Sequence, residues 1–83
     1  MGMEEITLTV RDYILSQFLP GENPDNLTSS TELITSGVLD SLATLRLVAF
    51  LEDSFGIETE PHELDPANLN TIADVTNFVL SKQ

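Results

Sequence analysis

Apolar residues near the start of the chain recur every three or four positions, which is the spacing of one face of an α-helix. The residues of this stripe are Ile6, Val10, Tyr13, Ile14 and Phe18. Polar residues, among them Arg11, Asp12 and Gln17, fall on the opposite side. Because Pro20 and Gly21 follow, we expect the first helix to end there.

Residues 22–31 are rich in Asn, Asp, Ser, Thr and Pro, and they predict a polar loop rather than a linker between domains. This loop would be unusually long for a connection between two helices. Leu33 and Ile34 follow it, and we expect them to pack the loop against the core.

The most apolar segment runs from Leu42 to Phe55 and predicts a second helix, with Gly56 placed to cap its C-terminus. Its side chains follow two stripes. One contains Leu42, Leu45, Val48, Ala49 and Glu52, and the other contains Leu47, Phe50, Leu51 and Ser54. We therefore expect this helix to be buried on more than one side and to be the central packing element.

Pro61 and Pro66 limit any helix between them to a short turn around residues 62–65. Thr71, followed three residues later by Asp74, resembles a helix cap. It opens a last helix whose apolar stripe is Ile72, Val75, Phe78 and Val79. The expected fold is an all-α bundle of three main helices plus one short helix, forming a single domain over residues 1–83.

The chain has 14 acidic residues against three basic ones, Arg11, Arg46 and Lys82, and a formal net charge of −11. This charge repels nucleic-acid phosphates and anionic membrane surfaces, so neither is an expected partner. The acidic surface can serve to bind a basic protein partner, or it can simply keep the protein soluble, and the charge alone favours neither explanation. The N-terminus lacks the basic residues of a signal peptide and no stretch is long enough to span a bilayer, so we expect a cytoplasmic protein.

A serine stands where the loop meets the second helix, in the run Gly37-Val38-Leu39-Asp40-Ser41-Leu42. The free N–H groups and the dipole of a helix N-terminus favour an anion, so a phosphodiester on the Ser41 hydroxyl would be stabilised there. Asp and Ser are also ordinary N-cap residues. From the local sequence alone, Asp40-Ser41 can be either an ordinary helix cap or an attachment site at Ser41.

The wider pattern resembles the attachment region of acyl carrier proteins. It comprises residues 36–42, Leu45, Leu47-Val48, Leu51-Glu52 and Phe55-Gly56-Ile57. The resemblance extends to the first helix, the long loop, Pro61 with Glu63-Leu64, and Thr71-Ile72. It implies that Ser41 receives 4′-phosphopantetheine from a separate Mg-dependent transferase, and that the thiol of this arm holds an acyl or aminoacyl thioester. The chain has no cysteine, so its reactive sulfur would come from the arm.

The resemblance also implies roles for the neighbours of Ser41. Asp40 would position the arm or the transferase; the alternative is that it only caps the helix. Leu42 would contact partner proteins; the alternative is that it is a core residue. Leu42, Leu45, Arg46 and Glu52 are the expected docking residues. The partners would be the phosphopantetheinyl transferase, an acyl- or aminoacyl-activating ligase, and a downstream synthase or transferase. The carrier itself would be a monomer and would catalyse no reaction.

Housekeeping fatty-acid carriers typically have acidic residues shortly after the motif, whereas this chain has Ala43 and Arg46 there. The chain therefore looks closer to stand-alone D-alanyl, aminoacyl and secondary-metabolism carriers, although Arg46 can also be read as a solvated helix residue. The cargo and the pathway stay open. His62 is the only histidine, and no metal site is expected. The alternative function is an unmodified acidic helical module that binds a protein partner.

Overall fold

Four α-helices and two short 3-10 helices form the regular structure of residues 2–83, the part of the chain that the computed structural model describes. In chain order they are α1 (Met3–Phe18), η1 (Pro24–Asn26), α2 (Ser41–Phe55), η2 (Pro61–Glu63), α3 (Pro66–Leu69) and α4 (Ile72–Lys82). These residues contain no β-strand. The expected all-α fold of three main helices with a long loop between the first two is confirmed.

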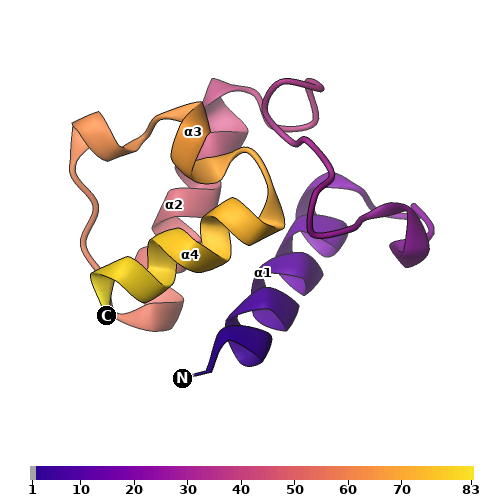
Figure 1. Ribbon diagram of the computed structural model, residues 1–83. Coiled ribbons are helices and arrows are strands. Elements are labelled where there is room, and N and C mark those ends of the chain that lie inside the picture. The colour runs from indigo at the N-terminus through magenta and orange to yellow at the C-terminus, as the bar shows by residue number, and fades with distance from the viewer. Residues whose placement is uncertain (1) are drawn as a thin grey trace.

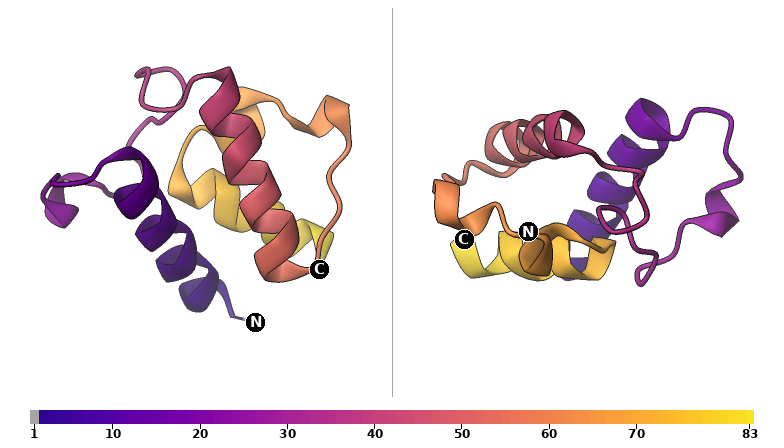
Figure 2. Two further views of the ribbon diagram at one scale, coloured as in Figure 1. Left: turned by 180° about the vertical axis from the view of Figure 1, so that it is seen from behind. Right: turned by 90° about the horizontal axis from the view of Figure 1, so that it is seen from above.

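The three long helices are arranged around one apolar core. α2 and α4 lie in two layers and α1 runs beside them, with its C-terminal half leading into the long loop (Figures 1 and 2). α1 packs mainly against α4, and α3 packs against α4 as well. α1 buries Ile6, Val10 and Ile14 of its predicted stripe, whereas Tyr13 and Phe18 are half-buried. α4 buries its whole predicted stripe, Ile72, Val75, Phe78 and Val79.

The expectation that α2 is buried on more than one side is wrong. α2 buries Leu47, Val48 and Leu51, whereas Leu42 is 69% exposed and Leu45 is 53% exposed. Apolar spacing alone cannot show which of two stripes meets a neighbouring helix. The reading of Leu42 as a core residue is wrong for the same reason, and an apolar surface remains on α2.

The segment between α2 and α4 forms two short helices instead of the single turn expected around residues 62–65. Pro66 does not end a helix but starts α3, at the first helical position, where a missing N–H costs nothing. Asp65 caps this helix by accepting a hydrogen bond from the Ala67 N–H at 2.8 Å. Proline interrupts a helix from within but is favoured at its first position, and both Pro61 and Pro66 begin a helix here.

The long loop is fixed to the junction of α3 and α4 by Asn70. The Asn70 side-chain oxygen accepts hydrogen bonds from the Ile34 N–H at 2.9 Å and the Thr35 N–H at 3.1 Å. The Leu33 N–H donates to the Asn70 carbonyl at 2.6 Å. Leu33 is fully buried, as expected, and the loop therefore reaches α2 in a defined position.

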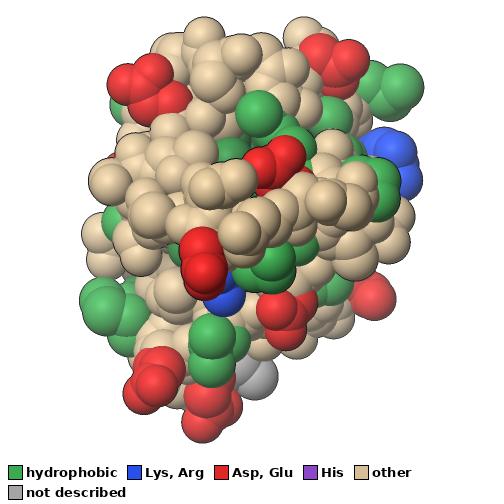
Figure 3. Space-filling model, turned by 90° about the vertical axis from the view of Figure 1, so that its right-hand side faces the viewer, with side chains coloured by type: hydrophobic (Ala, Val, Ile, Leu, Met, Phe, Trp, Pro, Cys, Tyr) green, Lys and Arg blue, Asp and Glu red, His purple; other side chains and the backbone are tan. Residues whose placement is uncertain are grey.

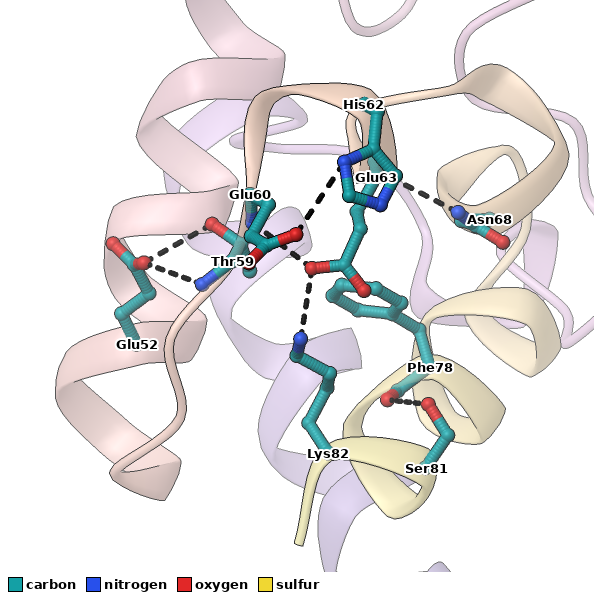
Figure 4. Close-up of polar contacts among 9 residues, drawn as sticks. All are labelled: Glu52, Thr59, Glu60, His62, Glu63, Asn68, Phe78, Ser81 and Lys82. Atoms are coloured by element: carbon teal, nitrogen blue, oxygen red, sulfur yellow. Dashed lines mark hydrogen bonds and ion pairs between the residues drawn. The ribbon is translucent and has the colours of Figure 1, made fainter.

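The segment after α2 is held at two points by carboxylates (Figure 4). Glu52 of α2 accepts hydrogen bonds from the Thr59 N–H at 2.9 Å and from the Thr59 hydroxyl at 3.0 Å. Glu63 of η2 pairs with Lys82 of α4 at 2.8 Å. Glu52, one of the expected docking residues, is half-buried and is engaged within the protein.

The Glu63–Lys82 pair predicts a pH dependence of stability. The hydrogen bond from Lys82 and a second one from the Glu60 N–H lower the pKa of Glu63 below its ordinary value. A carboxyl whose pKa is lowered by folding stabilises the protein above its unfolded pKa, and this contribution is lost as pH falls through the folded pKa. We expect Lys82→Met to have a lower Tm than wild type at neutral pH, with a gap that narrows below about pH 4.

Thermal unfolding followed by circular dichroism across this pH range measures the gap. Asn77→Asp is the matched control, because it also makes the chain more negative by one unit at neutral pH, and Asn77 is exposed and makes no hydrogen bond within residues 2–83. A Tm gap between Lys82→Met and wild type that stays constant on acidification would contradict the assigned role of the pair.

Candidate functional site

Ser41 is the first residue of α2 and is exposed to solvent. Asp40 precedes it in an extended conformation, and its carboxylate accepts a hydrogen bond from the Ala43 N–H at 2.8 Å. The Asp40 carbonyl accepts from the Thr44 N–H at 2.9 Å. Asp40 is therefore the N-cap, and the capping role that the sequence left open is present in the structure.

The Ser41 hydroxyl makes no hydrogen bond to another residue of the described chain. The N–H groups of the first turn have no carbonyl partner four residues back, and Asp40 takes only that of Ala43. No acidic residue follows Asp40 in the first turn. A phosphate attached to Ser41 would lie beside free N–H donors at the positive end of the helix dipole.

Gly37 gives the loop the turn that leads to this helix. Its φ angle is +88°, a left-handed conformation that glycine adopts without strain, and its N–H donates to the Ile34 carbonyl at 3.1 Å. Two residues later Leu39 is buried, and its N–H donates to the Leu33 carbonyl at 2.9 Å. These contacts fix the chain just before Asp40, so Ser41 is presented from an ordered loop.

A cavity of about 570 Å³ adjoins Ser41. Its apolar wall comes from four separate parts of the chain: the long loop, the first turns of α2, the residue that follows η2, and the start of α3. The wall residues are Ile34, Leu39, Leu45, Leu64 and Pro66, and Asp40, Ser41 and Thr44 complete the lining. The sequence does not predict this cavity, because its lining residues are far apart along the chain and leave no periodic signal. Leu39 and Leu64 do belong to the pattern that resembles acyl carrier proteins.

Three of the four expected docking residues lie together on one side of α2. Leu42, Leu45 and Arg46 are all exposed, and their spacing of three and four residues places them together. Glu52 lies two turns further along and is directed to Thr59. The structure thus brings three of the expected docking residues together beside Ser41 and separates the fourth from them.

Comparison with known proteins identifies the class to which this site belongs. Residues 14–79 match the family model described as "Phosphopantetheine attachment site". The chain therefore belongs to the phosphopantetheine-binding family of acyl carrier proteins, whose cofactor is 4′-phosphopantetheine and whose members are carriers rather than enzymes.

Individual relatives agree with this membership. The chain is 35% identical over 68 residues to the "Probable acyl carrier protein PigG" of Serratia sp. (strain ATCC 39006), covering 82% of this chain and 77% of the relative. It is 28% identical over 83 residues to the "Acyl carrier protein" of Lactobacillus acidophilus, covering 100% and 99%. The solved structure titled "Structure of KstB-PCP(apo)" superposes with a TM-score of 0.69 at 25% identity, over 96% of this chain and 88% of that one.

The residues at the start of α2 fit the family's cofactor. Ser41 offers a free hydroxyl for a phosphodiester, the first-turn N–H groups can donate to its oxygens, and the cavity can accept part of an apolar chain. When bound, the cofactor supplies a thiol, which this chain lacks. Within residues 2–83 no helix is long and apolar enough to cross a membrane, and no group of three metal-ligating side chains is present.

Substitution of Asp40 tests its capping role. Asp40→Ala leaves the Ala43 N–H without its partner, and we expect the free energy of unfolding to fall by about 1 kcal/mol. Asp40→Asn should keep most of this stability, because asparagine caps nearly as well. Urea unfolding measures the difference.

Asp53→Ala is the matched control, since Asp53 is an exposed carboxylate of the same helix that makes no hydrogen bond in the described chain. If Asp40→Asn unfolds as easily as Asp40→Ala, a capping role for the side chain is excluded.

Proposed function

We propose that Ser41 is the residue that carries 4′-phosphopantetheine, and that the protein holds an acyl or aminoacyl group as a thioester on this arm and presents it to partner enzymes. The observation that carries the proposal is the free, exposed hydroxyl at the start of α2, beside an apolar cavity and inside the segment that matches the family.

Neighbouring hydroxyls are less suited to attachment. Thr44 is the other hydroxyl residue that lines the cavity, and its oxygen donates to the Asp40 carbonyl at 2.8 Å. The Ser36 hydroxyl donates to the Glu32 carbonyl at 2.6 Å. Ser54 is exposed on α2 but lies at the opposite end of the helix. These contacts support Ser41 over its neighbours.

The attachment step needs an enzyme that supplies a base. The Ser41 oxygen would attack the phosphorus of coenzyme A that bears the pantetheine, forming a serine phosphodiester. The pyrophosphate bond would break, adenosine 3′,5′-bisphosphate would leave, and the hydroxyl proton would pass to a base of the transferase. Among residues 2–83 no acid or base makes a hydrogen bond to the Ser41 hydroxyl, so we assign this chemistry to the partner.

The partners after attachment would be an acyl- or aminoacyl-activating ligase and a downstream synthase or transferase, acting in the cytoplasm. We favour a stand-alone or secondary-metabolism carrier over a housekeeping fatty-acid carrier. Ala43 and Arg46 stand where acidic residues would favour a basic docking surface, and the structure places Arg46 on the exposed side of α2.

Intact mass tests the proposal. Incubation of the apo protein with coenzyme A, Mg²⁺ and a broad-specificity phosphopantetheinyl transferase should add one phosphopantetheine per chain, and Ser41→Ala should add none. Ser54→Ala is the matched control, because it removes an exposed hydroxyl from the same helix, and it should be modified completely.

If the folded wild-type protein gains no adduct, the carrier function is excluded and the alternative, an unmodified acidic module that binds a protein partner, is supported. An adduct that persists in Ser41→Ala would place the attachment at another hydroxyl.

A further inference from the structure

The cavity beside Ser41 joins segments that are far apart in the sequence. Ile34 and Leu39 belong to the long loop, whereas Leu64 and Pro66 belong to the segment that contains α3. α3 packs against α4, so this second part of the lining is fixed to the helices. The position of the first part depends on what holds the loop to the junction of α3 and α4.

Few apolar side chains hold the long loop in place. Among residues 22–39 only Leu27, Leu33 and Leu39 are buried. Figure 3 views the molecule from the side on which this loop lies in Figure 1, and uncharged polar side chains and backbone cover most of the surface there. The position of the loop therefore depends on hydrogen bonds as well as on these three leucines.

Asn70 makes every hydrogen bond that joins residues 32–39 to a segment outside the loop, within the part of the chain that the structure describes. Its side-chain oxygen accepts from the N–H groups of Ile34 and Thr35, and its side-chain nitrogen donates to the Thr35 hydroxyl at 3.3 Å. Its backbone carbonyl accepts from the Leu33 N–H. One residue thus connects the loop part of the cavity lining to the end of α3.

The loop residues that Asn70 holds form a closed turn that ends next to Ser41. The Leu39 N–H donates to the Leu33 carbonyl at 2.9 Å, and a second hydrogen bond, from the Gly37 N–H, lies inside the turn. A single residue separates Leu39 from Ser41. A displacement of the turn is therefore passed directly to the start of α2.

We infer that Asn70 is a positioning residue for phosphopantetheine attachment, because it holds the closed turn, and with it the Ser41 hydroxyl, against the junction of α3 and α4. The inference rests on the proposed function, since it concerns the hydroxyl that the transferase must reach. Asn70 acts through the turn and takes no part in the chemistry. Its hydrogen bonds go to the loop and not to α2, so it affects the orientation of Ser41 rather than recognition of the folded surface.

Asn70→Ala removes the acceptor of the Ile34 and Thr35 N–H groups and keeps the backbone carbonyl. The measured quantities are kcat and KM for modification of Ser41 by a broad-specificity phosphopantetheinyl transferase with coenzyme A and Mg²⁺. We expect kcat to fall about tenfold, since a displacement of about 1 Å in a reacting atom can cost up to about a hundredfold. KM should change little.

Asn70→Asp keeps an acceptor oxygen on a side chain of the same length, and it should recover most of kcat. Thr71→Ala is the matched control for stability, since Thr71 is the next residue and its hydroxyl accepts from the Asp74 N–H as the cap of α4. This control should lower Tm and leave kcat unchanged. A purely structural role of Asn70 would give the same result as the control.

Amide hydrogen exchange of the apo protein gives a readout that needs no enzyme. In Asn70→Ala the Ile34 and Thr35 amides should exchange at least about tenfold faster than in wild type, and in Thr71→Ala they should keep their protection. If circular dichroism shows that Asn70→Ala does not fold, Asn70→Gln takes its place. Its acceptor is displaced by one methylene group, and the same fall in kcat and the same faster exchange are expected.

The inference is overturned if the Asn70 variant loses no more kcat than Thr71→Ala, if its loss appears in KM alone, or if the exchange of the two amides is unchanged. A kcat of Asn70→Asp as low as that of Asn70→Ala also overturns it. Failure of the proposed function looks different, because the wild-type protein would then gain no phosphopantetheine at Ser41 under the same conditions.

Discussion

The start of α2 is held from two directions, and the candidate site depends on both. Within the helix, the Asp40 carboxylate binds the Ala43 N–H. From the loop side, Asn70 binds the backbone of residues 33–35, and Leu39 is buried with its N–H on the Leu33 carbonyl. A one-residue shift of the loop would rotate or bury Ser41. Ordering a loop of this length costs conformational entropy, and these few hydrogen bonds with the buried Leu33 and Leu39 offset part of that cost.

The charges of this protein are divided between internal and external contacts. Glu52, Glu63, Lys82 and Arg11 bind groups of the chain itself and hold the two irregular segments against the helices. Arg46 alone among the basic side chains of the described residues faces outward without an anion. The net charge of −11 gives the molecule a negative long-range potential. The exposed side of α2 that carries Leu42, Leu45 and Arg46 is instead apolar with one cation.

Much of the fold could be predicted because its signals are local. The stripes of α1 and α4, the cap at Thr71 and the left-handed Gly56 after α2 each follow from a few neighbouring residues. The burial of α2 could not be predicted, since Leu42 and Leu47 are equally apolar and only the packing of the bundle distinguishes them. The cavity and the role of Asn70 depend on contacts between distant segments, and Pro66 can end or begin a helix in sequence terms. Ser41 was proposed from its motif, and the structure adds its exposure.

The central claim is that one hydroxyl, at the entrance to α2, is the point of attachment. Fragmentation of the tryptic peptide that ends at Arg46, taken from phosphopantetheinylated protein, tests this claim most directly, because the peptide also contains Ser29, Ser30, Ser36 and Thr44. We expect every fragment that carries the modification to include Ser41. Modified fragments that lack Ser41 would contradict attachment at this residue.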